Sequence, residues 1–160
     1  MYSASALAGE AVGASPEIPD AVLFACGEHR FGLPLGAVRE VLGPRPLTRL
    51  PGCDAAVAGL VNLRGRVLTV FDLGTVLALG PSCAHEDHRL LVVAHGGRVA
   101  AFAVERMLGV GRAAVDELVM DAAALRALEI DRADLIGIGT HGGEPFLLLD
   151  AAHLLKRLLS

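Results

Sequence analysis

The sequence predicts a mostly β protein made of small antiparallel barrels, and three observations lead to that fold class. Apolar runs of strand length recur in pairs, a few polar or glycine residues separate the members of each pair, and the helical patterns between pairs are short. Paired runs of this kind are typical of β-hairpins, whereas parallel strands need long crossover connections. Hairpins at short spacing therefore favour closed antiparallel sheets over a βαβ fold.

Composition limits the classes of function. The chain has 160 residues, of which 53% are hydrophobic and only 4% aromatic, so one domain with a core of Leu, Val, Ala and Ile is expected. The formal net charge is −4, and no basic stripe suggests a nucleic acid partner. No apolar run reaches the ~20 residues of a membrane span, and the N-terminus lacks a signal-peptide pattern. We therefore expect a cytoplasmic protein with no direct membrane insertion.

The start of the chain predicts a tail followed by a hairpin. Residues 1–20 are rich in Ala, Ser, Gly and Pro without a sustained period, so we expect a flexible N-terminal tail. A single domain is expected at 21–159. Its first two strands are the apolar run Ala21–Cys26 and the returning segment Arg30–Leu33.

The segment Pro34–Leu42 predicts a short helix. Proline is tolerated at a helix start, because its missing N–H has no partner there in any case. The apolar residues that share one helical face are Leu35, Val38 and Leu42. A proline-rich loop follows, with a short extended piece expected at Leu47–Leu50.

Two apolar runs in the centre, Val57–Leu63 and Val67–Phe71, predict a second hairpin. Its polar break contains Asn62, Arg64 and Gly65. An arginine at such a turn is held on a rigid scaffold with its guanidinium free to contact another group.

Glycine pairs mark the hairpins of the second half. Gly96-Gly97 supplies the two positive φ angles that a type I′ turn requires, and a further turn is expected around Gly142-Gly143. The strands expected here are Leu90–Ala94, Val99–Val104, Leu108–Ala113, Leu135–Thr140 and Pro145–Leu149.

Three aspartates are placed to cap short helices. Asp72 precedes a helix expected over Leu73–Leu79, and Asp121 precedes one over Ala122–Leu128. Asp150 precedes a closing amphipathic helix, whose apolar stripe is Ala151, Leu154, Leu155 and Leu158.

No group of residues predicts catalysis. Gly137–Gly142 matches the glycine pattern of dinucleotide-binding loops, but a strand rather than a helix is expected after it, so nucleotide binding remains only an alternative. His85–His88 is interpreted as a solvated polar loop rather than a metal site. Ser82 lies in a loop without the glycines of a nucleophile elbow. Asp131 and Asp134 are interpreted as solvated surface.

The cysteines predict no further chemistry. Cys26, Cys53 and Cys83 are odd in number and form no CxxC motif, so neither a disulfide framework nor a metal or redox site is expected. We expect idle thiols, no metal and no cofactor.

The order and spacing of these segments resemble the CheW family, the adaptor proteins of bacterial chemotaxis. The most specific match is Gly-Leu-Val-Asn-Leu-Arg-Gly at Gly59–Gly65, and the likeness runs from about Ala21 to Leu159. Other matching segments are Phe31–Pro34, Val38–Val41, Val70–Leu73 and Leu135–Gly139.

The resemblance implies two intertwined, five-stranded, SH3-like β-barrels with a shared core, and no catalysis. It implies a scaffold that couples the cytoplasmic tip of a methyl-accepting chemoreceptor to the regulatory domain of a CheA-type histidine kinase, with recruitment to membrane receptor arrays. The receptor hairpin is then expected in a groove between the barrels. A module of a non-flagellar pathway that keeps only one of these partners remains an alternative.

Six residues are candidates for partner contacts: Arg64, Asn62, Gly65, Val38, Glu40 and Gly59. Arg64 has two open interpretations, because it can pair with a partner's carboxylate or clamp Asp72 or Glu40 of its own chain. Val38 is either a partner contact or a core residue. Gly59 either allows a partner's backbone to approach or marks a bulge.

Overall fold

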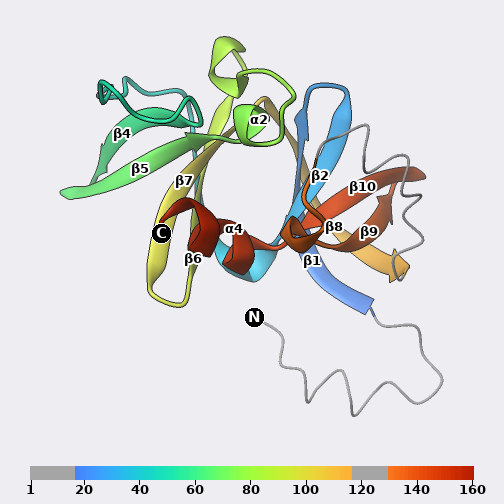
Figure 1. Cartoon of the computed structure of the whole chain (residues 1–160). Coiled ribbons are helices and arrows are strands. Elements are labelled where there is room, and N and C mark those ends of the chain that lie inside the picture. The colour runs from blue at the N-terminus through green and yellow to red at the C-terminus, as the bar shows by residue number, and fades with distance from the viewer. Residues whose placement is uncertain (1–16, 117–129) are drawn as a thin grey trace.

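Strands from both ends of the chain form the first of two β-sheets. The computed structural model describes residues 17–116 and 130–160. Within them, the first sheet closes into a barrel in the order β1-β2-β10-β9-β8 (Figure 1). Its neighbours pair antiparallel except β2 and β10, which are parallel. The strands are β1 (Glu17–Cys26), β2 (His29–Pro34), β8 (Arg106–Asp116), β9 (Leu135–His141) and β10 (Glu144–Leu149).

The middle of the chain forms the second sheet, which has five strands in the order β3-β6-β7-β5-β4. This sheet is open, and β3 and β4 are its outer strands. A backbone bridge between Thr48 and Leu60 lies beside β4 and forms the extended piece predicted at Leu47–Leu50. The strands are β3 (Val38–Leu42), β4 (Val57–Leu63), β5 (Arg66–Asp72), β6 (Arg89–His95) and β7 (Arg98–Val104).

Glycines form the hairpin turns where the sequence predicts them. Gly96 and Gly97 join β6 to β7 with φ angles of 56° and 80°. Gly142 and Gly143 join β9 to β10 with φ angles of 60° and 79°. The segment Gly137–Gly142 is therefore part of a β-hairpin, without the helix that a dinucleotide-binding loop requires.

The largest apolar cluster contains side chains of both sheets, so the two subdomains share a core. The helix α4 (Ala151–Leu158) follows the last strand of the barrel and packs on β6 and β7 of the open sheet. Asp150 caps it, because its Oδ1 accepts a hydrogen bond from the His153 backbone N–H at 3.1 Å. Fully buried side chains of this core include Phe24, Phe31, Leu33, Leu73, Leu91, Phe102, Leu154 and Leu155.

The predicted fold class is thus confirmed: the protein is mostly β, and the second five-stranded sheet is inserted along the chain between β2 and β8 of the first. The second sheet differs from a closed barrel, since β3 and β4 do not pair with each other. The shared core and α4 join the two halves, and each half also has a smaller apolar cluster of its own.

The predicted helix over Pro34–Leu42 is wrong beyond its first turn. A 3-10 helix, η1, covers Leu35–Ala37, and the chain then enters β3, which pairs antiparallel with β6. Val38 and Val41 are β-branched and favour an extended backbone. Pairing also satisfies backbone groups of β6 that burial would otherwise leave without partners.

Other boundaries differ by a few residues. β1 begins at Glu17, so the predicted end of the tail at residue 20 falls inside a strand. The helix after Asp72 is short, and α2 covers only Leu73–Val76. Residues 1–16 and the helix predicted over Ala122–Leu128 lie outside the described residues.

Candidate docking surfaces

The β4–β5 turn presents Arg64 at one end of the open sheet. Arg64 and Gly65 have φ angles of 52° and 81°, as a two-residue type I′ turn requires. Asn62 stabilises the turn, because its Oδ1 accepts a hydrogen bond from the Gly65 N–H at 2.9 Å. Arginine is unusual at a positive φ, and a residue held in such a conformation is a reason to look for a function.

Arg64 forms a bidentate ion pair with Glu40 across the open side of the sheet. Its Nη1 donates to Glu40 Oε2 at 2.9 Å and its Nη2 to Glu40 Oε1 at 2.7 Å. The hydrogen bonds lower the pKa of Glu40 below its ordinary value and raise the pKa of Arg64. The clamp within the chain is therefore formed, with Glu40 and not Asp72 as its acceptor. It links the outer strand β3 to the β4–β5 turn.

Two further candidates have clear structural roles. Gly59 is buried, has a φ of 151°, and lies at an irregularity in the β4–β5 register. A Cβ there would lie 2.7 Å from Thr48 O, so the backbone that approaches Gly59 is the chain's own. Val38 is half-buried against the shared core. Neither observation tests a partner contact, which stays a prediction for both residues.

A hollow of about 720 Å³ lies where the two subdomains meet. The barrel contributes Asp20 and Ile136, the open sheet contributes Arg39 and the β6–β7 turn, and the start of α4 completes the lining. Leu35 and Ile136 line it and are both 40% exposed. Exposed large apolar side chains in a hollow are typical of a protein-binding groove. We call this hollow the junction groove.

A second hollow of about 600 Å³ lies at one end of the open sheet, and we call it the arginine mouth. It adjoins the junction groove, since Arg39 and residues 94–96 line both. Four arginines from three strands and one turn line the arginine mouth: Arg39, Arg64, Arg66 and Arg98. Sequence reasoning missed this cluster because its members are distant along the chain and only the sheet order brings them together.

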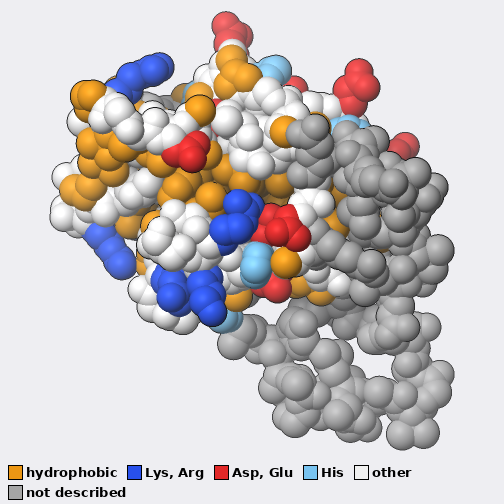
Figure 2. All heavy atoms as spheres, viewed as in Figure 1, with side chains coloured by type: hydrophobic (Ala, Val, Ile, Leu, Met, Phe, Trp, Pro, Cys, Tyr) orange, Lys and Arg blue, Asp and Glu red, His pale blue; other side chains and the backbone are white. Residues whose placement is uncertain are grey.

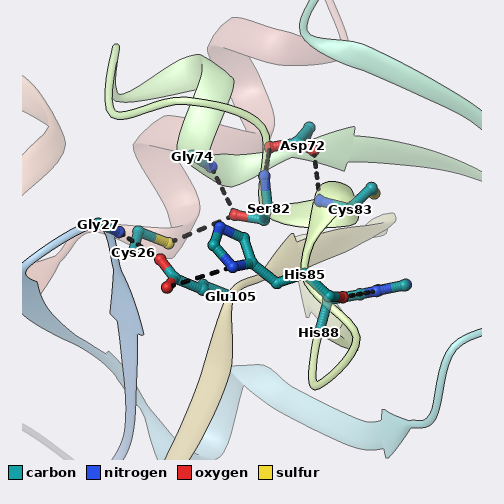
Figure 3. Close-up of polar contacts among 9 residues, drawn as sticks. All are labelled: Cys26, Gly27, Asp72, Gly74, Ser82, Cys83, His85, His88 and Glu105. Carbon is teal, nitrogen blue, oxygen red and sulfur yellow. Dashed lines mark hydrogen bonds and ion pairs between the residues drawn. The ribbon is translucent and has the colours of Figure 1, made fainter.

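A buried polar network holds the loop after α2 (Figure 3). Asp72 is 4% exposed, and its carboxylate accepts from the backbone N–H groups of Thr75, Ser82 and Cys83 at 3.1, 2.8 and 3.0 Å. Ser82 is itself buried, and its Oγ accepts from the Gly74 N–H at 3.1 Å. Its contacts are those of a structural residue that anchors a 3-10 helix, η2 (Ser82–Ala84).

Glu105 links both subdomains beside this network. Its Oε2 accepts from the Gly27 N–H of the β1–β2 turn at 2.6 Å, and its Oε1 lies 3.5 Å from His85 Nδ1 (Figure 3). Burial raises the pKa of the Cys26 thiol from 9.0 to about 11 and that of Cys83 to about 12, so both thiols are protonated near neutral pH.

The interpretation of Asp134 as solvated surface is wrong. Asp134 is 2% exposed and pairs with two side chains of α4: its Oδ2 accepts from Arg157 Nη2 at 2.7 Å, and its Oδ1 lies 3.3 Å from His153 Nε2. Figure 2 shows cationic, acidic and histidine side chains gathered over α4. The cluster attaches α4 to a 3-10 helix, η3 (Arg132–Asp134), and the sequence spacing of 23 residues gave no signal for it.

Over the described residues, no group of three or more His, Cys, Asp or Glu side chains is placed to hold a metal ion. No described helix is long and apolar enough to cross a membrane.

Comparison with known proteins decides the family. The family model described as CheW-like domain matches residues 20–159. The chain belongs to the CheW-like domain family. A solved CheW-like structure, the scaffolding protein TtCheW from Thermoanaerobacter tengcongensis, superposes with a TM-score of 0.69 at 24% identity, over 82% of this chain and 88% of that one. This likeness confirms the fold.

Curated CheW-like relatives come from several systems. Protein PilI of Pseudomonas aeruginosa is 37% identical over 58% of this chain and 52% of its own length. Chemotaxis protein CheW of Helicobacter pylori is 29% identical over 64% and 62%, and protein FrzA of Myxococcus xanthus is 34% identical over 69% and 72%. The match spans only about half of PilI and less than two thirds of the Helicobacter protein.

Proposed function

We propose that this CheW-like protein is an adaptor that couples a chemoreceptor's cytoplasmic tip to the regulatory domain of a CheA-type histidine kinase. The family match supports the scaffold class, and the junction groove is the observation that carries the proposal. The groove is formed by both subdomains, so a helical hairpin bound there contacts both of them. Its exposed Leu35 and Ile136 offer apolar anchors to such a hairpin.

Arg64 adds a polar contact next to that groove. Its side chain is 74% exposed although it is paired with Glu40, so its guanidinium remains accessible to an incoming carboxylate. Asn62 and Gly65 hold the turn in shape, and Glu40 pairs with the guanidinium. Among the six candidate residues, Arg64 is the proposed central contact. Asn62 and Gly65 hold its turn, Glu40 pairs with it, and Val38 and Gly59 stay predicted partner contacts on β3 and β4.

Co-precipitation tests the adaptor function. A receptor cytoplasmic fragment and the CheA-type kinase should both be retained by the wild-type protein. Leu35→Asp should weaken receptor retention strongly and Arg64→Ala more moderately, with unchanged circular dichroism. Arg106→Ala, an exposed arginine outside both hollows, is the matched control. Retention of neither partner by the wild-type protein would refute the proposal, and equal retention by Arg64→Ala would refute the role of Arg64.

The relatives' names leave the pathway open between flagellar chemotaxis and another chemosensory system. PilI and FrzA are proteins other than CheW itself, and this chain resembles them as closely as it resembles CheW proteins. An adaptor that keeps one partner should retain the receptor fragment or the kinase but not both. The same co-precipitation distinguishes an adaptor with one partner from an adaptor with two.

A further inference from the structure

We propose that the arginine mouth binds an acidic, amphipathic segment of a partner protein and that Glu40 occupies Arg64 until such a segment displaces it. The class of partner, a protein, rests on the proposed adaptor function. The charge and apolar character of the bound segment follow from the arginine mouth itself.

The charge of the arginine mouth opposes that of the whole protein. It contains four arginines and one carboxylate, Glu40, whereas the complete chain has a formal net charge of −4. Arg39, Arg66 and Arg98 are exposed, and none has a side-chain hydrogen bond or ion pair within the described part of the chain. Four like charges with a single counter-charge repel one another, so an incoming anion lowers the energy of the whole group.

Apolar side chains form the floor between the arginines. Leu63, Leu68, Val92 and Val99 line the hollow with them. Leu68 and Val92 are each 4% exposed, but Leu63 and Val99 are only half-buried, and a purely ionic ligand would leave their apolar surface uncovered. A segment that alternates carboxylates with apolar side chains satisfies both kinds of surface. No Phe, Tyr or Trp is among the lining residues, so the large aromatic rings on which a nucleotide base would stack are missing from this hollow. The surface therefore favours an acidic protein segment over a nucleic acid.

Glu40 is the internal competitor for such a segment. Its carboxylate holds Arg64 in a bidentate pair, the geometry that an incoming carboxylate would itself adopt. The pair is exposed, so water can replace either partner and exchange carries no large desolvation penalty. Removing this carboxylate should therefore strengthen the binding of an acidic segment, whereas a Glu40 that contacts the ligand directly would give the opposite result.

The test uses a fluorescein-labelled peptide of repeating Glu-Glu-Leu units and fluorescence anisotropy with the full chain. The triple variant Arg39→Gln, Arg66→Gln, Arg98→Gln should bind about tenfold more weakly, and Glu40→Gln about two- to fivefold more tightly. A Gln-Gln-Leu peptide should not bind measurably. Rising salt should weaken the wild-type complex, since exposed charges are screened.

A charge-matched control distinguishes binding at the arginine mouth from attraction of the peptide to positive charges anywhere on the protein. The triple variant Arg30→Gln, Arg106→Gln, Lys156→Gln also removes three positive charges, but all of them lie outside the arginine mouth. It should change the affinity for the peptide less than twofold. Equal losses in the two triple variants, weaker binding by Glu40→Gln, or equally tight binding of an oligothymidylate would each overturn the proposal. Because neither receptor nor kinase is present, this outcome is independent of the adaptor test.

Discussion

Replacing Asp72 with alanine should destabilise the protein more than any surface change of the same kind. The carboxylate accepts three hydrogen bonds from the backbone N–H groups of Thr75, Ser82 and Cys83, and Asp72 is 4% exposed. Alanine leaves the buried Ser82 N–H without an acceptor, at about 1 to 3 kcal/mol. The lost helix cap at Thr75 and the lost Cys83 bond, both partly buried, add about 1 kcal/mol each.

The expected total is about 3 to 5 kcal/mol, a large part of the ~5 to 15 kcal/mol by which domains are stable. Asp72→Asn should cost less, about 1 to 2 kcal/mol, because one oxygen can still accept from Thr75 and Ser82 while the amide meets the Cys83 N–H. The comparison of the two variants separates loss of acceptors from loss of charge.

Urea unfolding followed by far-UV circular dichroism measures this effect, since the chain has no Trp and one Tyr for fluorescence. With an m value of about 2 kcal/mol/M, the midpoint of Asp72→Ala should fall by about 1.5 to 2.5 M. Asp87→Ala, at an exposed aspartate in the following loop, should change stability by less than about 0.5 kcal/mol. A loss below about 1 kcal/mol for Asp72→Ala, or equal losses for alanine and asparagine, would refute the reasoning.

Three further perturbations test other parts of the structure. A double-mutant cycle of Asp134→Ala and Arg157→Ala should give a coupling of about 1 to 3 kcal/mol; a value below about 0.3 would mean that the pair acts as a surface pair. Gly59→Ala should cost about 2 to 4 kcal/mol because of its positive φ and the close backbone, whereas Gly43→Ala, which meets open space, should be neutral or stabilising. Stability should fall as pH rises from about 9 to about 11, because the Cys26 thiol loses its proton at a lower pH in the unfolded chain than in the folded protein. Cys26→Ser should remove about 2 to 3 kcal/mol of that fall. An unchanged pH profile of stability in this variant would contradict the burial of the thiol.

Much of this fold follows from short-range sequence signals. The turns at Gly96-Gly97 and Gly142-Gly143 need positive φ, and glycine supplies it wherever the rest of the chain lies. The caps at Asp72 and Asp150 satisfy N–H groups within a few residues. Such features depend on neighbours along the chain, so the sequence by itself determined the hairpins, the caps and the mostly β class. The family resemblance supplied the pairing of two barrels.

Only the tertiary structure decided what depends on distant strands. Val38–Leu42 has helical spacing, yet it became β3 because the edge of β6 offers hydrogen bonds that a helix cannot use. Asp134 is buried because α4 brings Arg157 to it from 23 residues away. The arginine mouth and the Glu40–Arg64 pair exist because the sheet order places β3, β5 and β7 around one hollow. Charge and burial at these sites arise from long-range packing, which no local pattern encodes.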